Sequence, residues 1–211
     1  MYQAQCYGCH GGPDGNGGWT WDKTSTAKFK FGDVTPWRVL GTDPERLHFR
    51  HATEIPPRVH ARFTTEFRKD HPLATFGLDD MIARTGDALG YYNGPISGAF
   101  LRAPYLHNAS VLTLAELIGL EKRQTRFYRG RNAYDTARVG LVSPSVPDAV
   151  GGISPGPANK DNYFVFDTSV RGNSAEGHRY PDWGFGLKPG ESLPTERKLQ
   201  LEDLLEYLKT L

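Results

Sequence analysis

Long hydrophobic runs are missing from this sequence of 211 residues, and no apolar stretch approaches the length of a membrane span. An excess of charge of one sign is missing too, because 25 Lys and Arg residues stand against 24 Asp and Glu residues, a formal net charge of +1. This balance gives no reason to expect nucleic acid or an anionic membrane as a partner. We therefore expect a soluble chain without a transmembrane segment.

Cysteine is scarce as well: the two cysteines are Cys6 and Cys9, and His10 follows directly. Cys-x-x-Cys-His is the spacing of c-type haem attachment, in which two thiols add to the porphyrin vinyl groups and the imidazole binds the iron. A structural zinc site would need a second pair of ligands, and a thioredoxin-like redox pair would need a βαβ setting; the sequence offers neither. We therefore predict one covalent haem c on Cys6, Cys9 and His10.

An export signal is also missing. Five residues precede Cys6, and they contain no apolar core of a signal peptide. Because haem c is attached after export, we expect Met1 not to be the natural start. The chain is then a mature or excised part of a longer protein that is exported to the periplasm or the cell exterior.

Glycine and proline are abundant, at 24 and 15 residues, which favours turns and long connections. The expected regular elements are mainly helical. They are the end of a haem-bearing helix at 1–10, a short helix that begins at Asp43 and Pro44, helices at 78–89, 113–120 and 195–208, and a short strand at 162–168. Thr113 and Glu116 are expected to form a capping box, and 140–160 a long loop. The sequence thus predicts one c-type cytochrome domain over residues 1–211, mostly α, with long Gly/Pro-rich loops.

The second axial ligand of the iron decides the chemistry, because His or Met makes an electron carrier and an open position admits small molecules. The candidates are Met81 and six histidines: His48, His51, His60, His71, His107 and His178. The first three histidines lie in basic, surface-type runs, His71 precedes a proline in a charged turn, and Met81 fits helix packing. His107 lies in a turn, and His178 ends a Gly-rich loop in which the backbone can approach a flat cofactor.

Residues 103–111, Ala-Pro-Tyr-Leu-His-Asn-Ala-Ser-Val, followed by Thr113 and Leu114, resemble a stretch of the bacterial dihaem cytochrome c peroxidases and their relatives. The closer resemblance is to the rubber oxygenase branch, the latex-cleaving dihaem cytochromes. It rests on five stretches in matching order, at 6–10, 41–44, 98–111, 127–140 and 172–178, and on the terminal helix. The resemblance covers nearly the whole chain but only the C-terminal half of such proteins.

The resemblance implies a mostly helical domain whose haem carries electrons and has histidine on both faces. Carried over to this chain, it makes His178 the ligand opposite His10, with Met81 as the alternative used by the classical peroxidases. It also places His107 beside the haem, as a contact of the ligand or of a propionate. Tyr105 and Asn173 are further expected hydrogen-bond donors near the haem. Trp19, Trp21 and Trp183 either shield the haem or pack in the core.

The chain departs from these relatives in two ways: the haem domain that binds peroxide or dioxygen is missing, and Ala109 stands where the family mostly has Gly. Three hypotheses follow. The leading one is an electron-transfer cytochrome domain that serves a redox partner protein or a second haem domain. The second is the electron-transfer half of a dihaem peroxidase or oxygenase. The third is a structural subunit of a larger redox assembly.

Overall fold

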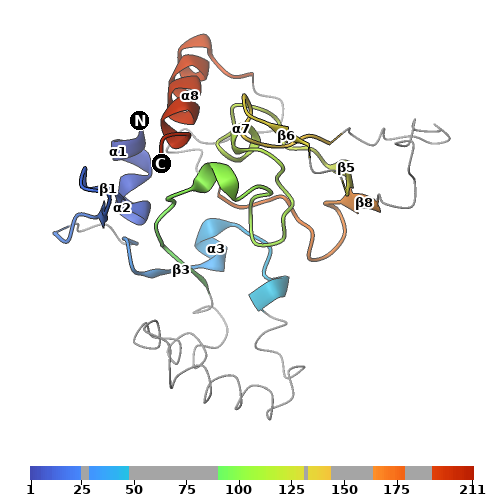
Figure 1. The fold of residues 1–211 in the computed structure, drawn as a ribbon. Helices are drawn as coiled ribbons and strands as arrows, with labels where there is room; N and C mark the ends of the chain where they lie inside the picture. Colours follow the sequence, from blue (N-terminus) through green and yellow to red (C-terminus); the bar gives the residue numbers. More distant parts are fainter. Residues whose placement is uncertain (25–28, 48–89, 131–132, 144–163, 179–191) are drawn as a thin grey trace.

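The structure is a computed structural model that describes residues 1–24, 29–47, 90–130, 133–143, 164–178 and 192–211 (Figure 1). The helices are α1 (Tyr2–Gln5), α2 (Tyr7–His10), α3 (Trp37–Leu40), the 3-10 helix η3 (Ala99–Leu101), α7 (Leu114–Leu117) and α8 (Thr195–Leu208). The strands are β1 (Gly12–Pro13), β2 (Trp19–Thr20), β3 (Val34–Pro36), β4 (Gly90–Tyr92), β5 (Arg126–Arg129), β6 (Tyr134–Asp135), β7 (Gly140–Leu141) and β8 (Phe164–Asp167). They pair as the antiparallel sheets β1–β2, β3–β4, β5–β8 and β6–β7.

The prediction of a mostly α fold is wrong, because only 28% of the described residues are helical and 19% are in strands. Most helices end after about one turn. Gly11 and Gly41 adopt left-handed φ values of 64° and 67° directly after α2 and α3, and a left-handed residue stops a helix. Aromatic residues in turn favour strands, and Phe127 lies opposite Phe166 in the β5–β8 pair, with ring centroids 5.1 Å apart.

Several predicted elements are confirmed. The helix at 195–208 is α8, and the predicted strand at 162–168 contains β8. The predicted helix at 1–10 is divided into α1 and α2 at Cys6, and the predicted helix start at Asp43 leads into helical residues at 45–47. The predicted helix at 78–89 lies outside the described residues, as does most of the loop at 140–160, of which Gly140 and Leu141 form β7.

The main core lies where α8 packs against the N-terminal helix and α7. The leucines that α8 buries are Leu201, Leu204, Leu205 and Leu208. Tyr2 of α1 packs on Tyr207 with ring centroids 4.9 Å apart, so the two ends of the chain lie side by side (Figure 1). The C-terminal residue is also fixed, because its carbonyl accepts a hydrogen bond of 2.9 Å from the Gly98 N–H. None of the described helices has the length and apolarity to cross a membrane.

The predicted capping box at the start of α7 is confirmed. The Thr113 hydroxyl accepts a hydrogen bond of 3.1 Å from the Glu116 N–H, and a Glu116 carboxylate oxygen accepts from the Thr113 N–H at 3.3 Å. Both side chains are buried, so water cannot replace these bonds. Burial also raises the pKa of Glu116, because the charged carboxylate loses its hydration.

We expect the substitution Thr113→Ala to lower the free energy of unfolding by about 1–2 kcal/mol, because it leaves the buried Glu116 N–H without an acceptor. Guanidinium unfolding followed by fluorescence measures the change. Thr113→Ser is the matched control, since it keeps the hydroxyl and should cost much less. Equal losses in the two variants would contradict the assignment of this free energy to the cap.

Candidate haem-binding site

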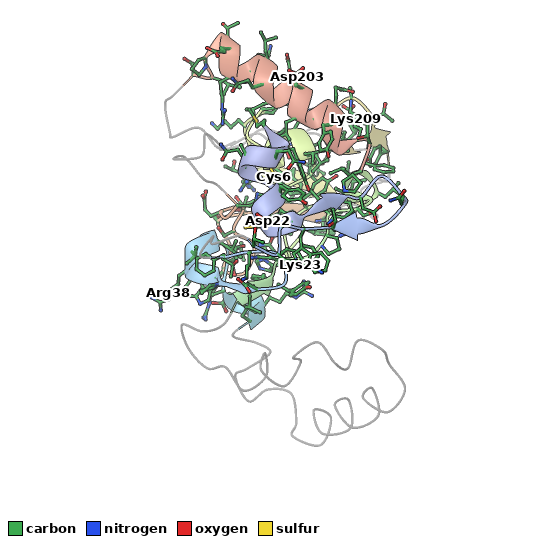
Figure 2. All side chains as sticks on the ribbon, turned by 90° about the vertical axis from the view of Figure 1, so that its left-hand side faces the viewer. Cys6, Asp22, Lys23, Arg38, Asp203 and Lys209 are labelled. Carbon is green, nitrogen blue, oxygen red and sulfur yellow. The ribbon has the colours of Figure 1, made fainter. Side chains whose placement is uncertain are left out.

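The haem motif lies on the short helix α2. Cys6 is its N-cap residue, and Cys9 and His10 lie in its single turn, so all three face one region. Both cysteines are half-buried free thiols, and the Cys9 Sγ donates to the Phe29 carbonyl at 3.4 Å. Burial raises the pKa of the Cys6 thiol to about 12 and also raises that of Cys9, so both stay neutral. Figure 2 shows Cys6 on the N-terminal helices beneath α8.

The His10 ring is oriented by a residue far away in the sequence. Its Nδ1 lies 2.9 Å from the carbonyl oxygen of Gly94, in the segment that follows β4. A carbonyl can only accept, so Nδ1 carries the proton and Nε2 keeps its lone pair. Burial lowers the pKa of His10, which favours the neutral ring. A neutral imidazole with a free Nε2 and a bonded Nδ1–H is the form that binds a metal.

The residues after His10 close one side of the site. The Trp19 Nε1–H donates to the His10 carbonyl at 2.7 Å. A Cβ on Gly11 would lie 2.5 Å from the Thr20 carbonyl oxygen and 2.8 Å from the Trp19 Nε1, so only glycine fits there. Trp19 therefore supports the backbone of the haem motif. Trp21 stacks on Phe31 with centroids 4.6 Å apart and is 37% exposed.

His178 lies opposite His10, with ring centroids 6.1 Å apart. An imidazole nitrogen lies about 1.1 Å from its ring centre and binds zinc at about 2.0–2.1 Å, so two imidazoles on opposite sides of one metal ion place their centroids about 6.3 Å apart. The observed centroid separation, with the ring planes tilted by 37°, leaves room for one metal ion bound by both rings. Burial, then the nearby His10 and Arg123, lower the pKa of His178 to about 3, so this ring too is neutral and able to bind.

The loop that carries His178 packs against the turn after α3. The His178 N–H donates to the Leu40 carbonyl at 2.9 Å. A Cβ on Gly177 would lie 2.6 Å from the Thr42 Cβ and 2.7 Å from the Thr42 Cα, so a side chain at this position would clash with the turn. Residues 177–178 thus pack closely against residues 41–42, which lie more than a hundred positions earlier in the chain.

Tyr105 and Asn173, the predicted hydrogen-bond donors near the haem, each donate to a main-chain carbonyl. Tyr105 is buried in the main core, and its hydroxyl donates to the Ala99 carbonyl at 3.0 Å. The Asn173 side chain donates to the Asp167 carbonyl at 3.2 Å, within the turn after β8. Neither hydrogen bond involves His10 or His178, and the contacts of Tyr105 and Asn173 with the haem stay predictions.

His107 lies beside Thr42, against which the His178 loop packs. Its Nδ1 is 3.3 Å from the Thr42 hydroxyl, and its ring stacks on Tyr91 with centroids 5.0 Å apart. Its Nε2 is buried and has no hydrogen-bond partner among the described residues. Thr42 contacts Gly177 as well, so His107 is one residue removed from the His178 backbone. The remaining candidate ligands, Met81, His48, His51, His60 and His71, and also Trp183, lie outside the described residues.

Sequence reasoning missed three residues that position the two histidines: Gly94, Thr42 and Arg123. Gly94 orients His10 through its main-chain carbonyl, and the sequence cannot indicate such a role because every residue has this group. Thr42 lies in the resembling stretch at 41–44, which assigns it no role. Arg123 gave no motif, yet its guanidinium donates to the carbonyls of Ala175 and Gly177 in the His178 loop.

Comparison with known proteins supports a cytochrome. Residues 90–128 match the model of the family described as RoxA-like, cytochrome c-like. The matched segment contains Gly94, Tyr105, His107 and Arg123 but neither the haem motif nor His178. The segment and the haem motif are thus separate observations that both indicate a c-type cytochrome, which implies haem c as the cofactor. The match supports a RoxA-like cytochrome; the dihaem peroxidase detail stays a prediction.

Two curated relatives come from Sinorhizobium fredii (strain NBRC 101917 / NGR234). The uncharacterized protein y4iM is 35% identical over 151 residues, which cover 66% of this chain and 32% of that protein. The uncharacterized protein y4iJ is 24% identical over 246 residues, which cover 100% of this chain and 37% of that protein. The chain therefore spans about a third of the length of the curated relatives it matches.

Proposed function

We propose that this chain is an electron-transfer cytochrome domain that carries one covalent haem c, with Cys6 and Cys9 as attachment residues and His10 and His178 as the axial ligands. The observation that carries the proposal is the 6.1 Å separation of two neutral imidazoles, one of them in the attachment motif. When bound, the haem supplies a reversible one-electron couple, and two histidines hold its potential below that of a His/Met pair.

The residues of the chain keep substrates away from the iron in this proposal. His178 would fill the position at which peroxide or dioxygen would otherwise bind. Its loop is held by two hydrogen bonds to the peptide group before it, from Arg123 to the Gly177 carbonyl and from the His178 N–H to the Leu40 carbonyl. The domain passes single electrons to a redox partner protein or to a second haem domain. Because haem c is attached after export, we place the domain in the periplasm or outside the cell, as part of a longer exported protein.

Replacement of His178 by Ala tests the ligation. We expect the exported, haem-loaded wild type to be low-spin and six-coordinate, and the variant to lose essentially all of the low-spin signal, because the iron loses one of its two imidazoles. Low-temperature absorption and electron paramagnetic resonance spectra measure the change, and added imidazole should restore the low-spin spectrum.

The matched control is Glu176→Ala, which alters an exposed side chain two positions earlier in the same loop and should leave the spectrum low-spin. An unchanged low-spin spectrum in His178→Ala would defeat the assignment. So would a charge-transfer band from thioether to iron in the wild type, which would give the position to Met81.

A second candidate function is the electron-transfer half of a larger oxidoreductase. The length of the curated relatives favours it, since about two thirds of each lies outside the matched region and has room for a second haem domain. Both candidates share the chemistry at His10 and His178. The haem content of the full-length exported protein separates them: one haem per polypeptide favours the relay, and two favour the enzyme.

A further inference from the structure

A buried arginine links the His178 loop to the core. Arg123 follows α7 and is only 8% exposed. A buried guanidinium costs free energy unless its N–H groups find acceptors. The Arg123 Nε donates to the Glu116 carbonyl at 3.2 Å and Nη2 to the Leu117 carbonyl at 3.0 Å. One edge of the guanidinium is therefore fixed to the carboxyl end of α7, where helix carbonyls lack partners within the helix.

The other edge of the guanidinium holds the loop. Nη1 donates to the Ala175 carbonyl at 2.5 Å and to the Gly177 carbonyl at 2.8 Å. The Gly177 carbonyl belongs to the same peptide group as the His178 N–H, which donates to Leu40 at 2.9 Å. This peptide group is thus held from both sides, by Arg123 on its oxygen and by α3 on its nitrogen.

His178 needs such support. Its φ is +53°, a left-handed conformation that residues with a Cβ rarely adopt. If the hydrogen bonds to the preceding carbonyl were absent, the loop could relax to an ordinary backbone conformation, and the imidazole would turn with it. A planar fork with five donors suits this task better than a lysine, which offers one point charge on a flexible chain.

We propose that Arg123 is a positioning residue that keeps His178 on the iron, and that its buried charge raises the reduction potential of the haem. The inference rests on the proposed ligation by His10 and His178. The ferric state carries one positive charge more than the ferrous state, so a nearby buried cation favours the ferrous state.

Two substitutions separate position from charge. Arg123→Lys keeps the charge and removes the fork, whereas Arg123→Gln removes both. Arg129→Gln is the matched control, because Arg129 is a half-buried arginine whose Nη1 donates to the Ala109 carbonyl at 2.8 Å and not to a carbonyl of residues 175–178. The readouts on the exported, haem-loaded protein are the rate of cyanide binding to the ferric haem, which requires His178 to leave the iron, and the reduction potential.

We expect cyanide to bind about tenfold faster in both Arg123 variants than in the wild type. We expect the ferric-to-ferrous equilibrium to shift about tenfold toward ferric in Arg123→Gln, which lowers the potential by about 59 mV for one electron. Arg123→Lys should stay within twofold of the wild-type equilibrium, and Arg129→Gln within twofold in both readouts.

Cyanide binding at the wild-type rate in Arg123→Lys would overturn the positioning role, and this variant decides it if Arg123→Gln does not fold. An unchanged potential in a folded Arg123→Gln would overturn the role of the charge. If Arg123→Gln does not fold, Arg123→Lys still tests that role. A potential that changes more in this charge-conserving variant than in the Arg129→Gln control would overturn it. A low-spin His178→Ala variant would instead defeat the proposed function itself, so the two failures are distinguishable.

Discussion

The double substitution Cys6→Ser and Cys9→Ser is expected to remove all covalently bound haem from the exported protein. Both sulfurs lie on or next to the single turn of α2, and the sequence has no other cysteine that could form a thioether. Serine keeps the size of the side chain but cannot add to a vinyl group under these conditions. Intact mass and haem-dependent peroxidase staining after a denaturing gel measure the loss.

Each single substitution is the control for the double one. Cys6→Ser and Cys9→Ser alone leave one thioether, so each variant should still carry haem after denaturation, in lower yield. The double variant keeps His10 and His178, and it should therefore bind added haem reversibly while losing it in the gel. A double variant that still carries haem after denaturation would contradict the attachment, and so would a wild-type protein that is colourless after export.

Local features of this molecule could be predicted from the sequence. The haem motif, the capping box of Thr113 and Glu116, and α8 each depend on residues a few positions apart, and each is set by spacing alone. One leucine of α8, Leu199, is nevertheless 57% exposed. A helical period fixes the direction of a face but not where the core ends.

The features that failed or were missed depend on distant contacts. The mostly α prediction did not foresee that residues 126–129 would pair with 164–167, since a short strand is stable only beside its partner. Gly94 orients His10 across 84 positions, and Arg123 reaches Gly177 across 54. No local pattern encodes such contacts, because the acceptor in each case is a main-chain carbonyl that every residue possesses.

Gly177→Ala is expected to lower the free energy of unfolding by about 3 kcal/mol, the upper part of the usual range for single substitutions. Two costs combine at this position. The φ of +101° disfavours any residue with a Cβ. The new Cβ would also meet the Thr42 Cα at 2.7 Å and the Thr42 N at 3.0 Å, atoms of the backbone that cannot turn away as a flexible side chain would. Guanidinium unfolding of the haem-loaded protein measures the loss.

Gly172→Ala separates the two costs, because Gly172 lies in the same loop with a similar φ of +89°, but its added Cβ would meet only the Glu45 side chain at 3.7 Å, an ordinary contact. We expect this control to lose only about 1–2 kcal/mol, the backbone cost alone. The difference between the two losses in free energy of unfolding then measures how much the close packing of the His178 loop against Thr42 matters. Gly177→Ala should also raise the high-spin fraction, since the clash displaces the residue next to His178. Equal losses in both variants, with an unchanged spectrum, would mean that Thr42 does not support the loop.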